Sequence, residues 1–368
     1  MFKFNELKSV HLEISTRCQA SCPMCPRKYH GGVENKNLKI ADWSYADFVK
    51  IFNSEVYQQL ELIYFCGNFG DPILNDDLIL MCQHIKDNAP NISVRIHTNG
   101  GARSKQWWIN LYRSLPENHV VIFAIDGLED THHIYRIGTT YDNVVKNATT
   151  FINAGGTAEW VFIKFKHNEH QADEAELRSK KLKFSRFTLK STTRFVADSP
   201  YNVVNSKGET LYYLEPATNN KMTFISKQVI MNHQEILTNS TIDCYVLSTK
   251  EIYIDAHKNV FPCCFLASAP YNYQSNTAPS DELDRMIDKF HNVSLDQYYN
   301  LVESLGGIGQ LSAISFSIKE IINRDKWQTV WKEYWDKKKL YTCARVCGKT
   351  VNNFSKPKDQ FIKRVNND

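Results

Sequence analysis

The stretch HLEISTRCQASCPMCPRK, residues 11–28, decides the fold, because a short apolar strand runs directly into a cysteine-rich loop. Cys18, Cys22 and Cys25 give this loop the spacing C-x3-C-x2-C. Three thiolates this close together can bind one side of an iron–sulfur cluster and leave its fourth iron open for a substrate or cofactor. Because an electron carrier normally closes its cluster with four cysteines, the spacing favours a cluster that takes part in chemistry.

A structural zinc site is the alternative interpretation of this loop. His30 would then be the fourth ligand, since zinc sites with three cysteines and one histidine are common. A second metal site, either an iron–sulfur cluster or a zinc knuckle, can form from the later cysteines. These are Cys244, Cys263, Cys264, Cys343 and Cys347. Cys82 has helical spacing with apolar neighbours and is expected in the core, and Cys66 is expected to be structural at the end of an apolar strand.

Length and composition describe a globular chain of 368 residues, enough for about two domains. With 42% hydrophobic and 23% charged residues, it does not have the composition of a disordered or collagen-like chain. The formal net charge of +4 is too small to indicate a class of binding partner, so neither a nucleic acid nor a membrane is expected. The chain has no long apolar stretch and no signal-peptide pattern, which predicts a cytoplasmic protein whose cysteines do not form disulfides.

Strand and helix patterns alternate along the first half of the chain. Six short apolar runs predict buried parallel strands: Val10–Ser15, Leu62–Cys66, Ile92–His97, Val120–Asp126, Trp160–Phe165 and Phe184–Leu189. Helical patterns lie between them: Trp43–Phe52, Asp76–Asn88 after an Asn75 cap, Ser104–Leu115, Tyr141–Ala154 and Gln171–Leu182. This series predicts an α/β fold, a partial (β/α)6 TIM-like barrel, with functional residues in the loops after the strands.

A smaller second domain is expected after the barrel, where the periodicity weakens. Residues 251–255 and 259–263 flank a turn and predict a hairpin that ends at Cys263. An apolar stripe at helical spacing predicts a packing face near the C-terminus: Ile321, Trp327, Val330, Trp331, Tyr334 and Trp335. This segment is expected to carry Cys343 and Cys347 back to the hairpin. The expected boundaries are 1–195 for the barrel, 196–240 for a connecting segment, 241–350 for the second domain and 351–368 for a polar tail, frayed or in a short helix.

The motif RCQASCPMC, directly after the first strand of a βα series, resembles the C-x3-C-x-φ-C motif of radical S-adenosylmethionine (SAM) enzymes. The resemblance covers nearly the whole chain, because four later cysteines are similar to those of the twitch domain, a reduced relative of the SPASM domain. These four are Cys244, Cys263, Cys343 and Cys347. The resemblance implies a [4Fe–4S] cluster with SAM on the first three cysteines. It also implies an auxiliary iron–sulfur cluster, expected to be [4Fe–4S], on the later four, with Cys264 as a spare.

Other segments resemble the SAM-binding motifs of the family. FGDP, Phe69–Pro72, is similar to the GGEP segment, which implies that Gly70 and Asp71 hold the amine of SAM. The alternative is that Asp71 only forms a turn before the next helix. Asp71 stands where the family has Glu, and Ala124 stands where it has Ser. The resemblance implies further SAM contacts, with the arginine on the SAM carboxylate, from Met24, Thr98, Asn99, Asp126, Arg136 and Asn168.

The resemblance implies an enzyme that cleaves SAM reductively to a 5′-deoxyadenosyl radical, which abstracts hydrogen from a substrate. The expected substrate is a peptide or protein, or a small molecule such as a sugar or nucleoside. The expected electron donor is a flavodoxin or ferredoxin. No catalytic residue and no reaction subclass are assigned. The alternative is a non-catalytic binding protein that zinc or an iron–sulfur cluster stabilises.

Overall fold

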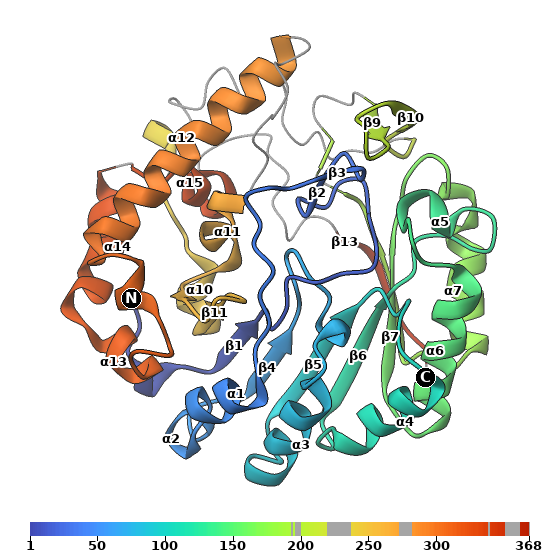
Figure 1. The fold of residues 1–368 in the computed structure, drawn as a ribbon, viewed down its shortest axis with the longest axis horizontal. Coiled ribbons are helices and arrows are strands. Elements are labelled where there is room, and N and C mark those ends of the chain that lie inside the picture. Colours follow the sequence, from blue (N-terminus) through green and yellow to red (C-terminus); the bar gives the residue numbers. More distant parts are fainter. Residues whose placement is uncertain are drawn as a thin grey trace.

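A computed structural model describes residues 1–192, 194–195, 200–218, 237–271, 282–337, 339–349 and 361–367, with the backbone alone for 282–291. One sheet of nine strands organises this part of the chain, in the order β12-β11-β1-β4-β5-β6-β7-β8-β13 (Figure 1). Its six central strands are parallel: β1 Ser9–Leu12, β4 Leu62–Phe65, β5 Ser93–Thr98, β6 His119–Ala124, β7 Ala158–Ile163 and β8 Arg186–Lys190. The predicted α/β fold, an open partial barrel, is confirmed.

Helices cover the outer side of these strands (Figure 1). They are α1 Tyr45–Ile51, α2 Ser54–Tyr57, α3 Leu78–Asn88, α4 Lys105–Ser114, α6 Tyr141–Asn153 and α7 Ala172–Lys181. The short α5, His132–Tyr135, lies near the ends of the strands, where Tyr135 packs in a separate apolar cluster. Alternate strand residues such as Val10, Ile63 and Val94 are fully buried in one core with Trp108 and Phe151 from the helices. The period of two along each strand therefore separates an outer, apolar face from an inner face.

The start of α3 differs from the expectation. The helix begins at Leu78 with Asp77 as its N-cap, so Asn75 is not the cap. Asn75 instead donates to the carbonyl oxygens of Ile14 and Trp43, both at 2.9 Å, and accepts from the N–H of Asp77 at 2.8 Å. These bonds use the amide to connect β1, α1 and α3, which delays the first helical turn.

A second group of elements extends the sheet beyond β1. The predicted hairpin is confirmed as β11 Glu251–Ile254 and β12 Val260–Phe261, and β11 pairs parallel to β1. The helices around it are α10 Tyr245–Thr249, α11 Cys264–Ala267, α12 Glu282–Ser304, α13 Ile318–Asn323, α14 Asp325–Asp336 and α15 Tyr341–Cys347. The predicted aromatic packing face is confirmed, because Trp327 and Trp331 of α14 are buried in the core.

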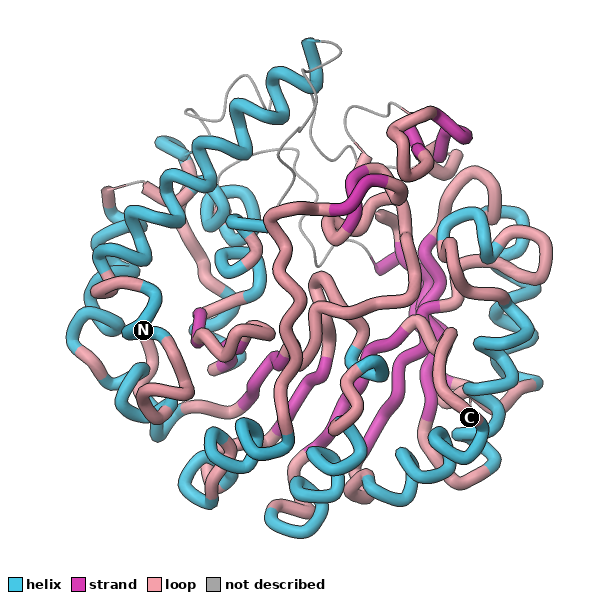
Figure 2. The backbone as a smooth tube through the Cα atoms, viewed as in Figure 1, coloured by secondary structure: helices cyan, strands magenta, loops and turns pink. Residues whose placement is uncertain are grey.

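Two short hairpins lie near the ends of the strands (Figure 2). They are β2 Lys28–Tyr29 with β3 Val33–Glu34, and β9 Tyr201–Val204 with β10 Thr210–Leu214. The rest of the expected connecting segment includes 196–199 and 219–236, which lie outside the described residues. The predicted domain boundaries stay predictions.

The expectation of a frayed or helical tail is wrong for residues 361–366. They form β13, Phe361–Asn366, which pairs antiparallel with β8. The edge of a sheet presents unpaired backbone groups, and β13 satisfies those of β8 although three of its six side chains, Lys363, Arg364 and Asn366, are polar. Residues 351–360 of the expected tail lie outside the described part of the chain.

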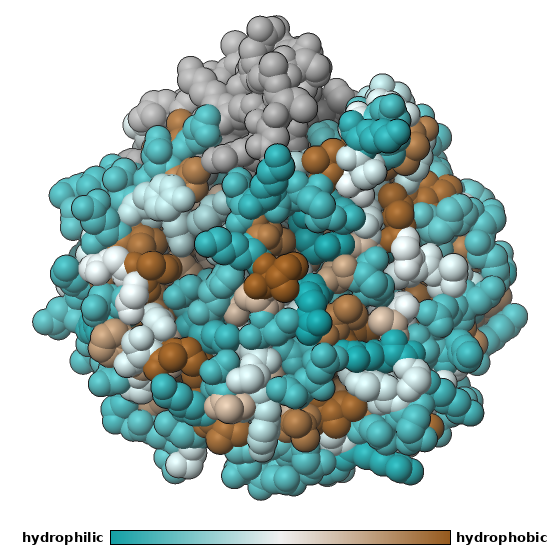
Figure 3. All heavy atoms as spheres, in the orientation of Figure 1, coloured by the Kyte–Doolittle hydropathy of each residue, from teal (hydrophilic) through white to brown (hydrophobic). Residues whose placement is uncertain are grey.

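The surface is mostly polar on the face drawn in Figure 3, where apolar side chains lie singly or in small groups. Among the described residues, no helix has the length and apolar character needed to cross a membrane.

Candidate functional site

The first three cysteines lie in the loop after β1, above the carboxyl ends of the parallel strands (Figure 2). Cys22 is buried, and Cys18 and Cys25 are half-buried. A backbone turn, in which Cys25 N–H donates to Cys22 O at 2.9 Å, brings two of them close together. The loop therefore presents its thiols where a βα fold collects functional groups.

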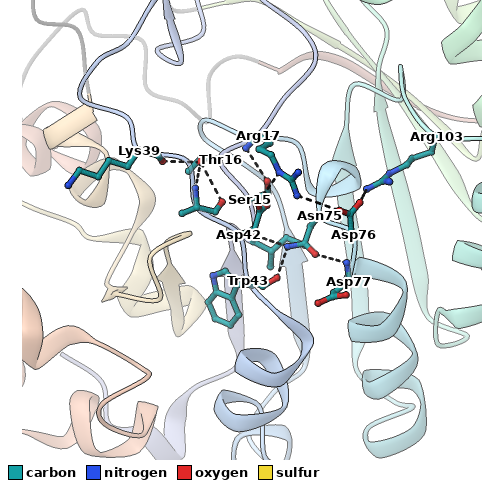
Figure 4. A network of polar contacts seen from close by, with 12 residues as sticks. Ser15, Thr16, Arg17, Lys39, Asp42, Trp43, Asn75, Asp76, Asp77 and Arg103 are labelled. Atoms are coloured by element: carbon teal, nitrogen blue, oxygen red, sulfur yellow. Dashed lines mark hydrogen bonds and ion pairs between the residues drawn. The ribbon is translucent and has the colours of Figure 1, made fainter.

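Ion pairs hold the chain immediately before Cys18 (Figure 4). Arg17 Nε lies 2.8 Å from Asp42 Oδ2, and the Nη2 atom of the same guanidinium lies 3.7 Å from Asp76. Arg103 also contacts Asp76, at 2.8 Å. Because such partly exposed pairs each add little stability, their main effect here is to orient the entrance of the cysteine loop.

Two N–H donors point at cysteine sulfurs. Asn99 Nδ2 lies 3.5 Å from Cys18 Sγ, and Arg136 Nη1 lies 3.6 Å from Cys22 Sγ. Burial raises the pKa of both thiols, while Arg136 acts in the opposite direction on Cys22. Donors of this kind stabilise a thiolate, which is the form that binds a metal.

Asp71 joins the loops after β4 and β5. Its carboxylate accepts hydrogen bonds from Thr98 Oγ1 at 2.8 Å, from Asn99 N–H at 2.7 Å and from Ile73 N–H at 3.2 Å. Asp71 is also the N-cap of a short 3-10 helix, Pro72–Leu74, so it does form a turn, and whether this is its only role stays open. Burial raises the pKa of Asp71 in spite of these donors. A carboxylate has about four acceptor positions, and these three donors leave one of them for the amine of SAM. The contact between Asp71 and SAM stays a prediction.

Gly70 lies where the loop after β4 touches the loop after β1. A Cβ atom at Gly70 would lie 1.9 Å from the carbonyl oxygen of Ser15, so this position requires glycine. The Glu13 carboxylate accepts from the N–H groups of Phe69 and Gly70 at 2.8 and 3.2 Å. These contacts hold the FGDP segment directly against the cysteine loop.

Asp126 and Arg136 form an ion pair with 2.6 Å between Oδ2 and Nε. Asp126 is fully buried, and its Oδ1 accepts from Ile163 N–H at 2.5 Å. Burial raises the pKa of Asp126, and Arg136 opposes that effect. Because Arg136 also points at Cys22, a SAM carboxylate would have to share this guanidinium with two partners.

Asn168 stabilises the loop after β7 through hydrogen bonds. Its amide donates to Asp126 O at 3.2 Å and to Ile163 O at 3.0 Å, and it accepts from Phe165 N–H at 2.7 Å. Met24 is buried in a small apolar cluster that also contains Phe165 and Cys22. Contacts of Asn168 and Met24 with SAM stay predictions.

The later cysteines lie on elements that are neighbours of the hairpin. Cys263 is the N-cap of α11, and Cys343 and Cys347 lie on α15. The backbone joins these elements, since Asp243 N–H donates to Cys347 O at 2.9 Å. A hydrogen bond that the Cys244 thiol donates to Cys347, and then burial, raise the pKa of Cys244. The elements that carry the four cysteines of the expected auxiliary cluster therefore lie in one region, and the cluster itself stays a prediction.

Cys264 has different surroundings from Cys263. Burial raises the pKa of both thiols, but the cysteines that act on Cys264 are Cys263 and Cys66, whereas Cys347 acts on Cys263. Cys82 is fully buried in the core, as predicted.

The donor set of the first loop fits an iron–sulfur cluster. Such a cluster binds each cysteine through a different iron atom, so its ligands surround it. The first loop supplies three thiols, with N–H donors at two of the sulfurs, which are the donor types that such a cluster uses. Within the described ranges, no three His, Cys, Asp or Glu side chains meet as ligands of a single metal ion. His30, the fourth ligand of the zinc interpretation, places Nδ1 2.7 Å from Asn202 O.

Sequence reasoning missed a group of polar side chains on the inner face of the sheet. His11 Nε2 donates to Cys66 O at 2.9 Å, and the Tyr64 hydroxyl lies 3.0 Å from His97 Nδ1. Burial lowers the pKa of His11 to about 4 and that of His97 to about 3, so both imidazoles are neutral. The alternation of polar and apolar residues in HLE, YFC and RIH was the available signal.

Comparisons with known proteins agree with this architecture. No family model matches the chain. A tungsten-containing aldehyde ferredoxin oxidoreductase cofactor-modifying protein of Pyrococcus furiosus is 27% identical over 166 residues, which cover 44% of this chain and 40% of that protein. The match therefore spans less than half the length of this curated relative.

Solved structures are similar over a larger share of the chain. The structure of histidine-tagged anSMEcpe with bound AdoMet has a TM-score of 0.51 and 14% identity, over 93% of this chain and 85% of that one. Streptococcus suis SuiB has a TM-score of 0.49 and 13% identity, over 80% of this chain and 66% of that one. At such identities the likeness concerns the fold. The likeness to the AdoMet-bound structure supports the predicted fold, and the resemblance to radical SAM enzymes stays a proposal.

Proposed function

We propose that this protein is a radical SAM enzyme. When bound, a [4Fe–4S] cluster with SAM supplies reductive cleavage to a 5′-deoxyadenosyl radical, which abstracts hydrogen from the substrate. The observation that carries the proposal is the cysteine loop after β1, where Asn99 and Arg136 direct N–H groups at Cys18 and Cys22. The FGDP segment packs against the same loop through Gly70.

The chain contributes ligands, orientation and exclusion of water. Cys18, Cys22 and Cys25 would hold the cluster, and Asp71 and Gly70 would orient the amine of SAM. The apolar cluster around Met24, which includes Tyr135 and Phe165, covers one side of the cysteine loop. A dry environment of this kind strengthens polar interactions and protects a reactive radical.

An auxiliary cluster on Cys244, Cys263, Cys343 and Cys347 is the second part of the proposal. Four cysteines leave no iron open, which favours electron transfer or a structural role over binding of the substrate. The electron donor would be a protein of the flavodoxin or ferredoxin class. The substrate would be a peptide or protein, or a small molecule such as a sugar or nucleoside.

Anaerobic reconstitution with iron and sulfide tests this function. We expect about eight irons and eight sulfides per chain, and formation of 5′-deoxyadenosine from SAM under a strong reductant. Cys22→Ala should abolish that product, whereas Cys82→Ala, in the core, should retain it. A protein that binds stoichiometric zinc and never forms 5′-deoxyadenosine would support the non-catalytic alternative.

A further inference from the structure

The loop after β4, which carries the FGDP segment, is held by a tyrosine from the second group of elements. The hydroxyl of Tyr253, on β11, donates to Glu13 Oε2 and accepts from Asn68 Nδ2 at 3.2 Å. The other carboxylate oxygen, Glu13 Oε1, accepts from the N–H groups of Phe69 and Gly70 at 2.8 and 3.2 Å. One phenol hydroxyl therefore holds this loop twice, directly at Asn68 and through Glu13 at the FGDP segment.

Most of this connection is shielded from water. Glu13 and Tyr253 are each 1% exposed, and Phe69 is 4% exposed. Hydrogen bonds in such surroundings are stronger than in water, and a buried polar group that loses its partner is costly. The bonds of the Tyr253 hydroxyl are therefore expected to fix the loop in one position.

The loop in turn fixes the predicted SAM contact against the cysteine loop. Gly70 lies so close to the carbonyl oxygen of Ser15 that no Cβ atom fits between them. Asp71 N–H donates to Arg17 O at 2.8 Å, in the residue before the first cysteine. A displacement of Gly70 would therefore also move the Asp71 carboxylate relative to the cysteine loop.

A second tyrosine of the same group of elements packs on this loop. Tyr271 ends the 3-10 helix Ala269–Tyr271, and its ring centre lies 5.3 Å from that of Phe69, at an angle of 75°. The carbonyl oxygen of Tyr271 accepts from Asn35 Nδ2 at 2.8 Å. The second group of elements therefore contacts both the FGDP segment and the chain that follows the three cysteines.

We propose that Tyr253 is a positioning residue for SAM. Its hydroxyl acts through Glu13 and Asn68 on the loop that would present Gly70 and Asp71 to the amine. This inference rests on the proposed function, because it names a residue that acts on the same SAM site. It gives the second group of elements a part in SAM affinity that is separate from any cluster on its cysteines.

Tyr253→Phe tests the proposal, because it removes the hydroxyl and keeps the ring, whose centre lies 5.0 Å from that of His11. The Kd of SAM is measured by equilibrium dialysis with the reconstituted full-length protein. It should rise about tenfold, as expected for loss of one buried hydrogen bond. Formation of 5′-deoxyadenosine at saturating SAM should stay within about twofold of wild type, since a loss of binding alone raises KM and leaves kcat.

Tyr334→Phe is the matched control. The Tyr334 hydroxyl, on α14, is also buried in the second group of elements, and it donates to Asn300 O at 2.9 Å and lies 2.7 Å from Ser304 Oγ. Both partners belong to α12 and neither belongs to the FGDP segment. This variant should lose stability without a change in the Kd of SAM.

Hydrogen exchange provides a readout that needs no SAM. The N–H groups of Phe69 and Gly70 donate to Glu13, so Tyr253→Phe should speed their exchange about tenfold in the reconstituted protein. Mass spectrometry of the peptide that contains these two residues measures the change, and Tyr334→Phe should leave it unchanged. Asn68→Ala removes the other bond of the Tyr253 hydroxyl and serves as the second variant, in which the Kd of SAM should also rise.

The positioning role and the proposed function fail in different ways. If the wild-type protein binds SAM and Tyr253→Phe binds it as tightly as Tyr334→Phe does, the positioning role is wrong and the proposed function stands. Unchanged exchange of Phe69 and Gly70 in Tyr253→Phe, or an unchanged Kd in Asn68→Ala, would also overturn the positioning role. If the reconstituted wild-type protein does not bind SAM, the proposed function is wrong and the positioning role falls with it.

Discussion

At the scale of single residues, Glu13 connects the parts of the molecule that the proposed chemistry needs. It follows β1, accepts from the FGDP segment through Phe69 and Gly70, and accepts a hydrogen bond from Tyr253 of β11. Tyr253 also accepts from Asn68 Nδ2 at 3.2 Å. One buried carboxylate thus links the barrel, the predicted SAM loop and the auxiliary hairpin.

The shifted pKa of Glu13 predicts that the stability of the protein depends on pH. Burial raises its pKa from 4.5 to about 7, so the folded protein favours the protonated form. The preference of the folded protein for protonated Glu13 contributes about 3 kcal/mol to the free energy of unfolding. This contribution is fully present below about pH 4.5 and is lost as the pH rises through 7. The free energy of unfolding should therefore fall between about pH 5 and pH 8, and Glu13→Gln should make this fall smaller.

Glu251 provides the matched control, because burial also raises its pKa to about 7. Glu251→Gln should remove its own share of the fall and leave that of Glu13. An unchanged pH profile in Glu13→Gln would contradict the raised pKa.

Substitution of Asp71 can distinguish a purely structural role of this residue from a contact with SAM. Asp71→Ala leaves the buried donors of Thr98 and Asn99 without a partner, which should cost about 2–4 kcal/mol in urea unfolding. If Asp71 also holds the SAM amine, the Kd of SAM should rise about tenfold or more. Asn75→Ala, which removes a buried amide outside the predicted SAM contacts, should destabilise the protein with little change in that Kd. Equal losses of affinity in both variants would assign Asp71 a structural role alone.

At the scale of elements, the site depends on how closely two loops approach. Gly70→Ala would place a Cβ against the backbone of the loop that carries the cysteines. We expect a loss of about 2–4 kcal/mol in unfolding free energy and a lower iron content after reconstitution. Gly309→Ala is the control, because nothing lies within 4 Å of the added Cβ atom. A Gly70 variant that behaves like the Gly309 variant would show that the approach is not required.

At the scale of the whole molecule, the two groups of cysteines make a prediction about metal content. Replacing Cys18, Cys22 and Cys25 together by Ala should lower the iron from about eight to about four per chain. Replacing the four auxiliary cysteines should have the same effect on the other cluster, with circular dichroism as the control for folding. Loss of all iron in either variant would contradict two independent sites.

Most of the architecture was predictable because its signals are local. The six parallel strands, the hairpin that ends at Cys263 and the packing face of α14 follow from periodicity and turn residues within short windows. The cysteine spacing is local too, and it led directly to the proposed cluster. The polar rows of β1, β4 and β5 were readable as alternation, yet the strands were interpreted as uniformly buried.

The amino-acid sequence by itself therefore determined the βα series, the cysteine loop and the class of chemistry that we propose. Only the tertiary structure decided the partners of the polar groups, because these contacts join residues far apart along the chain. Glu13 and Tyr253 are separated by 240 positions. β13 pairs with β8, and no local pattern of polar and apolar residues predicts which distant strand an edge strand will join.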